Sequence, residues 1–337
     1  MPEPSPTRPK RRGRLFRFTA ALLVLCGVAA YLVVQYITGG GGARGCTVVS
    51  ADGSGTSFEF TPEQAANAAT IAAVGTGRGM PERAVTIALA TALQESGLRN
   101  IEHGDRDSLG LFQQRPSQGW GTEQQIMDPD YAAGIFYAHL AKVPDYMDLP
   151  LTVAAQRVQR SGYPEAYAKH EADAGLLAAA LTGRAAATLT CDGRRDTTAT
   201  ATGPDAVRAA LVRDFGRDAL QETGAEVGGV PVPSPSPAPS VAATAQGSTV
   251  TVAVPEGART DARGRTELER GWQLAHWAVA NSSALHIQRV AYAGREWTVG
   301  STSNTWRTVA SDGSAGAGAG SQAGERPTGV VRIVTGQ

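Results

Sequence analysis

One carboxylate, Glu95, stands at the end of an apolar helical pattern, an unusual place for a charged side chain. Residues 81–97 predict a helix, because Pro81 suits a first helical position and Gly97 suits a left-handed cap. Glu95 falls in the last turn, at the edge of the apolar face. The negative end of the helix dipole and the apolar neighbours both favour the protonated acid. General acid catalysis near neutral pH requires that form, so Glu95 is the candidate catalytic residue.

A second motif follows this helix after a polar loop. Residues 108–114 are Ser-Leu-Gly-Leu-Phe-Gln-Gln, which places two amides beside whatever Glu95 faces. Together, Glu-Ser-Gly-Leu at 95–98 and Gly-Leu-Phe-Gln at 110–113 resemble the signature of lysozyme-like lytic transglycosylases. The resemblance covers residues 60–180, roughly a third of the chain. The alternative is that Glu95 is an ordinary surface carboxylate at a fraying helix end.

The resemblance implies an enzyme that cleaves peptidoglycan at the β-1,4 bond between N-acetylmuramic acid and N-acetylglucosamine. Glu95 would protonate the leaving oxygen and then act as base, so that the muramoyl 6-hydroxyl attacks C1 and forms a 1,6-anhydro product. The residues implied to orient the sugars are Ser96, Gln113, Gln114 and Gln159. No cofactor and no metal ion are expected.

Aromatic residues supply further candidate sugar contacts. Trp120 lies between two glycines and could stack on a sugar ring, but a tryptophan that anchors a loop would have the same surroundings. Tyr137, on the helix expected from Pro129, is a further candidate that the resemblance implies, and core packing explains it equally well. Residues 153–167 stand where the family has an Ala-x-x-Tyr-Asn-Ala-Gly segment, but they lack a Tyr-Asn pair. The candidate substitutes are Gln159 and Tyr163.

The acidic loop at 102–107, Glu-His-Gly-Asp-Arg-Asp, has three interpretations. It is a solvated turn, or it supplies Asp105 or Asp107 as a second catalytic carboxylate, which would make hydrolysis the better account. As a metal site, His103 and the two aspartates would be short of ligands. A metal-handling or transport accessory would depend on this loop alone.

Two cysteines, Cys46 and Cys191, bracket the segment that contains Glu95. Outside the cytoplasm, two cysteines at the ends of one domain most simply form a disulfide. Closing a loop of this size stabilises a fold by roughly 4–5 kcal/mol in the chain-entropy model. The alternative is a pair of unpaired buried thiols.

The N-terminus predicts a membrane anchor. Residues 1–17 form a basic tail, and residues 18–37 are uncharged and apolar over the length that a membrane-spanning helix needs. The positive-inside rule then puts the tail in the cytoplasm and the main domains outside. A cleaved signal peptide would need a small-x-small site, and a lipoprotein at Cys26 would need a small residue in place of Leu25.

The expected fold class is mainly α: a lysozyme-like helical domain at 46–192 behind one transmembrane helix, plus a small α+β domain. Helices are expected to begin near Pro62, Pro129, Leu151 and Pro164, the last of them running to Leu181. A linker at 193–247 contains one amphipathic helix and a Pro/Ser-rich spacer. The accessory domain at 248–337 is expected to contain a helix over 261–285, a hairpin over 287–299 and a final strand over 329–335.

Charge excludes one class of partner. The chain has 31 lysines and arginines against 31 aspartates and glutamates, so its net charge does not favour nucleic acid. The expected partners are peptidoglycan strands and the membrane. The competing class of function is a non-catalytic wall-binding or scaffold protein with a degenerate lysozyme-like fold, which the unusual 153–167 segment favours.

Overall fold

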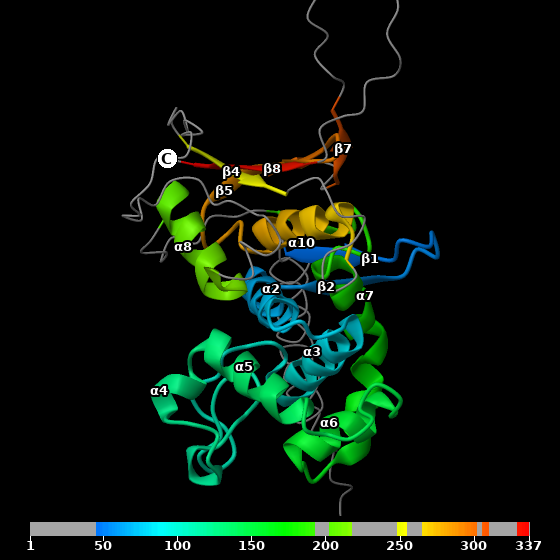
Figure 1. Ribbon diagram of the computed structural model, residues 1–337, viewed down its shortest axis with the longest axis vertical. Coiled ribbons are helices and arrows are strands. Elements are labelled where there is room, and N and C mark those ends of the chain that lie inside the picture. The colour runs from blue at the N-terminus through cyan, green and yellow to red at the C-terminus, as the bar shows by residue number, and fades with distance from the viewer. Residues whose placement is uncertain are drawn as a thin grey trace, which may run out of the picture. The chain divides into compact units, whose positions relative to one another are not determined.

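Two antiparallel sheets and a set of helices make up the part of the chain that the computed structural model describes (Figure 1). The described residues are 45–192, 202–217, 248–254, 265–301, 305–309 and 329–336. Gly45–Gln337 forms one compact unit.

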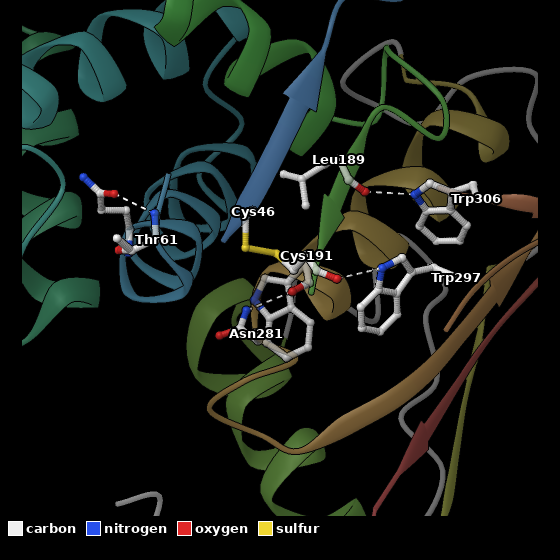
Figure 2. The surroundings of a disulfide bond; sticks show 9 residues. Cys46, Thr61, Leu189, Cys191, Asn281, Trp297 and Trp306 are labelled. Atoms are coloured by element: carbon white, nitrogen blue, oxygen red, sulfur yellow. Dashed lines mark hydrogen bonds between the residues drawn. A yellow bond between two sulfur atoms is a disulfide. The ribbon is translucent and has the colours of Figure 1, made fainter. Parts of the chain in front are cut away.

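The first sheet joins the two ends of the segment that contains Glu95. Its strands are β1 (Cys46–Val49), β2 (Ser57–Phe60) and β3 (Leu189–Cys191), in the order β2-β1-β3. Cys46 lies directly opposite Cys191 in the register, and the two form a disulfide (Figure 2). The predicted disulfide is therefore confirmed.

Helices fill the sequence between these strands. They are α2 (Pro62–Gly77), α3 (Glu82–Ser96), η1 (Pro116–Gln118), α4 (Glu123–Ile126), α5 (Pro129–Leu140), α6 (Leu151–Gln159), η2 (Pro164–His170) and α7 (Glu171–Leu181). The helix expected near Pro62 begins with a capping box: Thr61 Oγ1 accepts from the Gln64 backbone, and Gln64 Oε1 accepts from the Thr61 backbone. The Gly97 cap of α3 has the expected left-handed conformation, with φ 62° and ψ 38°.

Two local expectations were wrong. Pro81 caps α3 from outside and the helix begins at Glu82, because the Pro81 backbone is extended rather than helical. The single helix expected over 164–181 is divided at His170 into the 3-10 segment η2 and the α-helix α7. This division matters because η2 contacts α3, α6 and α7.

The C-terminal part contains the second sheet. Its elements are α8 (Pro204–Phe215), β4 (Thr249–Ala253), α10 (Glu267–Ala280), β5 (Ile287–Tyr292), β6 (Arg295–Thr298), β7 (Arg307–Thr308) and β8 (Val330–Thr335). The strand order is β4-β8-β5-β6-β7, and all pairs are antiparallel. The expected hairpin and final strand are confirmed, whereas the described helix is shorter than the expected range.

The helix α10 lies between this sheet and the preceding helices and strands (Figure 1). It contacts β5 and β8 on one side and α2, α7 and β3 on the other. Two indoles extend this contact: Trp297 Nε1 donates to the Cys191 carbonyl at 3.1 Å, and Trp306 Nε1 donates to the Leu189 carbonyl at 2.9 Å (Figure 2). The outer edge of β3 is therefore satisfied by tryptophan side chains instead of another strand.

The expected fold class was wrong. A mainly helical lysozyme-like domain behind a transmembrane helix does not describe a unit in which three-stranded and five-stranded antiparallel sheets accompany the helices. The strands of the first sheet have only three or four residues each, too few for a clear periodicity, and β3 pairs with β1 across the whole segment. Among the residues that the structure describes, no helix combines the length and apolar character needed to cross a bilayer. The predicted span at 18–37 lies outside the described residues.

Candidate functional site

Glu95 occupies the last turn of α3, as the helical pattern predicts. Its side chain is half-buried, and the next residue in the helix, Ser96, is buried. Tyr167 Oη donates a hydrogen bond to Glu95 Oε1 at 2.6 Å. Among the described residues, no donor forms a hydrogen bond with the other carboxylate oxygen, Oε2. One oxygen is thus held and the other is left for a further partner.

Tyr167 is the site residue that sequence reasoning missed. It comes from η2, and its ring is buried. Burial raises the pKa of the Tyr167 phenol well above its ordinary value, and the adjacent Glu95 carboxylate raises it further. The phenol therefore stays protonated and acts as a donor to the carboxylate, a charge-assisted hydrogen bond. Its position at the end of the 153–167 segment was the only signal available in the sequence.

The motif after the helix is attached directly to the end of α3. Ser96 Oγ donates to the Leu111 carbonyl at 2.7 Å. Gln159 Nε2, from the end of α6, donates to the Phe112 carbonyl at 2.7 Å. Both predicted sugar-binding side chains therefore hold backbone carbonyls of the Gly-Leu-Phe-Gln segment near Glu95. The structure brings the two motifs together through these contacts.

The two glutamines of the motif also make internal contacts. Gln114 is buried, and its Nε2 donates to the Ala132 carbonyl of α5 at 3.1 Å. Gln113 is half-buried and its Nε2 donates to the Gly110 carbonyl at 3.2 Å. A Cβ atom on Gly104 would lie 1.8 Å from Gln113 Oε1, so the glycine of the acidic loop makes room for this amide. Both glutamines thus organise the loop in the structure.

The aromatic candidates separate into three environments. Tyr137 is buried, and its Oη donates to the Ile71 carbonyl of α2 at 2.9 Å, so it packs in the core. Trp120 is half-buried and stacks on His139 with ring centroids 4.4 Å apart. Tyr163 is 79% exposed. Of the three, Trp120 and Tyr163 have surface that a ligand could reach.

The two candidate second carboxylates differ sharply. The Asp105 side chain is 93% exposed, and its ion pair with Arg106 spans 3.9 Å. Asp107 is held on both oxygens: Arg115 Nε donates to Oδ1 at 2.7 Å, and the Ser117 backbone donates to Oδ2 at 2.9 Å. Hydrogen bonds from Ser117, and then from Arg115, hold the pKa of the Asp107 carboxyl well below its usual range. Asp107 therefore acts as a permanent anion that ties the loop together.

The part of the chain that the structure describes contains no set of side chains suited to bind a metal ion. No group of three or more histidine, cysteine, aspartate or glutamate side chains lies close enough to hold an ion there. The loop that contains His103 and Asp105 is exposed, and Asp107 within it is engaged by Arg115.

Comparison with known proteins finds a likeness in the C-terminal part. Residues 237–318 match the family model described as VldE, C-terminal domain. No curated protein matches the chain. The matched range covers about a quarter of the chain and begins far beyond Glu95. It includes α10 and the hairpin β5–β6. Both follow the disulfide-closed segment, residues 46–191, in the sequence, so the match has no bearing on the carboxylate site.

Proposed function

We propose that this protein cleaves peptidoglycan glycan strands at the β-1,4 bond between N-acetylmuramic acid and N-acetylglucosamine, with Glu95 as general acid and base. The observation that supports this most is the Glu95 carboxylate itself. It is half-buried at a helix end, one oxygen is held by Tyr167 at 2.6 Å, and the other oxygen accepts no hydrogen bond from the described residues. This arrangement suits a carboxyl group that exchanges a proton with a ligand.

The reaction uses this carboxyl group twice. Protonated Glu95 gives its proton to the glycosidic oxygen, and the bond between C1 and that oxygen breaks with an oxocarbenium-like transition state. The carboxylate that results then removes the proton of the muramoyl 6-hydroxyl, whose oxygen bonds to C1 and closes the 1,6-anhydro ring. Tyr167 stabilises the carboxylate between the two steps, because its O–H donates to Glu95 Oε1.

The candidate second carboxylates favour this transglycosylase route over hydrolysis. A carboxylate that activates water or attacks the sugar needs an oxygen available to that partner. Both oxygens of Asp107 already accept hydrogen bonds from Arg115 and Ser117. Asp105 is exposed and remains the candidate if hydrolysis occurs.

The site belongs to a compartment that allows disulfides. The Cys46–Cys191 bond connects the two ends of the segment that contains Glu95, and such bonds persist outside the reducing cytoplasm. Peptidoglycan lies in that compartment. The disulfide thus supports an extracytoplasmic location, and the predicted anchor at 18–37 remains a prediction from the sequence.

A second candidate function is a non-catalytic wall-binding protein. The observation that favours it is the inward position of several implied sugar contacts: Ser96, Gln114 and Tyr137 are all buried and bonded to backbone carbonyls. A binding surface would then depend on Trp120 and Tyr163, which reach the surface.

The deciding experiment is mass spectrometry of purified peptidoglycan after incubation with the full chain. Glu95→Gln is compared with the wild type and with Glu59→Gln, a matched change at an exposed carboxylate of β2. We expect anhydro-muropeptides from the wild type and Glu59→Gln, and a loss of at least about 100-fold with Glu95→Gln. Products with reducing ends would instead show hydrolysis and direct attention to Asp105. If no variant forms a product but the protein still co-sediments with peptidoglycan, the protein is a wall-binding protein and not an enzyme.

A further inference from the structure

The segment η2, which carries Tyr167 to Glu95, depends on other elements to keep its shape. It runs for 7 residues as a 3-10 helix. Such helices have poorer hydrogen-bond geometry than α-helices and rarely continue beyond three or four residues. The segment is packed against α3, α6 and α7. The position of Tyr167 at the carboxylate therefore depends on how η2 is attached to these neighbours.

Two side chains of η2 attach it to the last turn of α3. Tyr167 Oη donates to Glu95 Oε1 at 2.6 Å. His170 Nε2 lies 3.2 Å from Gln94 Oε1, and because a carboxamide oxygen only accepts, Nε2 bears a hydrogen and donates it. Gln94 and His170 are both half-buried, which strengthens their hydrogen bond relative to one in open water.

The spacing of these two contacts fixes both the place and the rotation of η2. In a 3-10 helix, side chains three residues apart point in the same direction, one turn of about 6 Å along the axis. Tyr167 and His170 have this spacing, and their partners Glu95 and Gln94 are adjacent in α3. One contact alone would leave η2 free to turn about it. The two together keep the Tyr167 hydroxyl against the carboxylate.

His170 is supported from the C-terminal side by a regular helix. It is the last residue of η2, and α7 begins at the next residue, Glu171. The helix α7 packs against α3. The contact between His170 and Gln94 is thus made where η2 joins an element that α3 already holds, whereas Tyr167 lies within the 3-10 segment.

We propose that His170 is a positioning residue for Glu95, because its hydrogen bond to Gln94 holds η2 where Tyr167 meets the carboxylate. His170 itself exchanges no proton with the substrate. The catalytic consequence rests on the proposed function: the Tyr167 donor stabilises the Glu95 carboxylate that forms after the first proton transfer. The effect on the carboxyl group can also be measured without turnover.

The first measurement is the rate at which the full chain cleaves purified glycan strands. His170→Ala removes the donor, whereas the amide of His170→Gln places an N–H at a similar reach. We expect His170→Ala to lower kcat by about 3- to 10-fold with KM unchanged, since one hydrogen bond that positions the acid is lost. His170→Gln should restore kcat. Lys169→Gln, at an exposed neighbour in η2, should match the wild type.

The second measurement follows the Glu95 carboxyl carbon by NMR through a pH titration of the full chain with ¹³C-labelled glutamate. Its signal is assigned by its absence in Glu95→Gln. We expect the titration midpoint to move to higher pH in His170→Ala, because Tyr167 then donates less well to the carboxylate. Gln94→Ala removes the acceptor of the same bond, so it should give an equal shift, and the double variant should shift no further. Gln94→Ala also decides the question if His170→Ala does not fold.

Two further variants separate position from charge. A protonated His170 near Glu95 would by itself lower the carboxyl pKa, and His170→Ala would remove that charge. His170→Gln is neutral but keeps the donor, so it should leave the midpoint at the wild-type value. In Tyr167→Phe the donor to the carboxylate is gone, so adding His170→Ala should produce no further shift.

The two measurements distinguish this proposal from the proposed function. If the wild type cleaves nothing but His170→Ala and Gln94→Ala shift the titration, the positioning role stands and the enzyme does not. The positioning role is overturned if both variants keep the wild-type midpoint. It is also overturned if His170→Gln shifts the midpoint as much as His170→Ala, or if the shift persists in the Tyr167→Phe background, because charge would then explain the effect.

Discussion

At the scale of single residues, the direction of hydrogen bonds decides what each polar side chain does. Ser96 and Gln159 have the residue types of sugar-binding groups, yet each donates to a backbone carbonyl of the 110–113 motif. Tyr167, which no motif singles out, donates to the carboxylate. Polar groups removed from water are mostly hydrogen-bonded within the protein, so the burial of Ser96 and the partial burial of Gln159 favour a role in holding the loop over contact with a ligand.

Asp107 gives a prediction at this scale. Its pKa lies below the usual range in the folded protein, so the unfolded chain binds its proton first as the pH falls. The stability it contributes is present above the unfolded value of about 3.9 and is lost as the pH falls toward the folded value. We expect Asp107→Asn to lose less stability than the wild type between about pH 4 and pH 2, measured by urea denaturation.

The matched control for this prediction is Asp105→Asn. Asp105 is in the same loop but is 93% exposed, with an ion pair at 3.9 Å. Its replacement should leave the acid dependence of the wild type unchanged. Equal acid dependence in Asp107→Asn and the wild type would show that the bonds from Arg115 and Ser117 do not stabilise the fold.

At the scale of elements, α10 approaches the turn after α7 more closely than any side chain would allow. Gly183 in this turn has φ 86°, and a Cβ atom there would lie 1.8 Å from the Glu269 carbonyl of α10. Another glycine, Gly271 in α10, accepts the ring of Tyr292 against its backbone, where a Cβ atom would lie 1.9 Å from the ring. Two glycines therefore permit the contacts that α10 makes on its two sides.

We expect Gly183→Ala to destabilise the protein by about 2–4 kcal/mol, because the change combines a strained φ with a backbone clash. Urea denaturation of the full chain measures this. Gly175→Ala is the matched control: Gly175 lies in α7 with nothing within 4 Å of an added Cβ, so alanine should stabilise it by about 0.5–1 kcal/mol. A Gly183→Ala variant as stable as Gly175→Ala would contradict the close approach.

At the scale of the whole molecule, His276 joins the C-terminal part to the disulfide-closed segment. Its Nδ1 lies 2.8 Å from the Ala180 carbonyl, so Nδ1 bears the hydrogen, and Nε2 accepts from the Thr188 backbone at 3.3 Å. Against it lie the rings of Trp272 and Trp306. A second proton on this imidazole would lie on Nε2 and face the Thr188 N–H, so this contact favours the neutral form of His276.

This contact predicts a loss of stability at mildly acidic pH. Burial lowers the pKa of His276 from 6.5 to about 4, so between these values the unfolded state binds more protons than the folded state. Stability should therefore fall as the pH decreases from about 6.5 to about 4, by about 3 kcal/mol if the group acts alone. Urea denaturation at pH 7, 5.5 and 4 measures the loss.

His276→Asn tests the assignment. Asparagine can still donate to Ala180 but does not titrate, so we expect lower stability at pH 7 and a smaller loss between pH 7 and pH 4. His103→Gln, at an exposed position of the acidic loop, should keep the wild-type pH dependence. A wild-type loss that survives in His276→Asn would assign the pH dependence to other groups.

Several local elements could be predicted from the sequence. The helix that ends at Gly97, the capping box of Thr61 and Gln64, and the hairpin over 287–298 each depend on residues a few positions apart. The pairing of Cys46 with Cys191 could also be predicted, because only two cysteines lie beyond residue 26. Periodicity, capping and cysteine spacing are properties of the chain itself, and they predicted these features correctly, although they placed the start of α3 one residue early and missed the division at His170.

The tertiary structure alone decided the rest. Strands β1 and β3 are too short to be recognised, and β3 pairs with β1 although the two lie more than 140 residues apart in the sequence. Tyr167 reaches Glu95 across 72 residues, and Trp297 reaches Cys191 across 106. No local sequence pattern predicts such contacts, because they depend on which groups the fold buries and on the need to pair buried donors with acceptors. The sequence by itself therefore determined the ends of several helices and indicated Glu95 as the candidate acid, and only the folded chain decided which side chains surround Glu95.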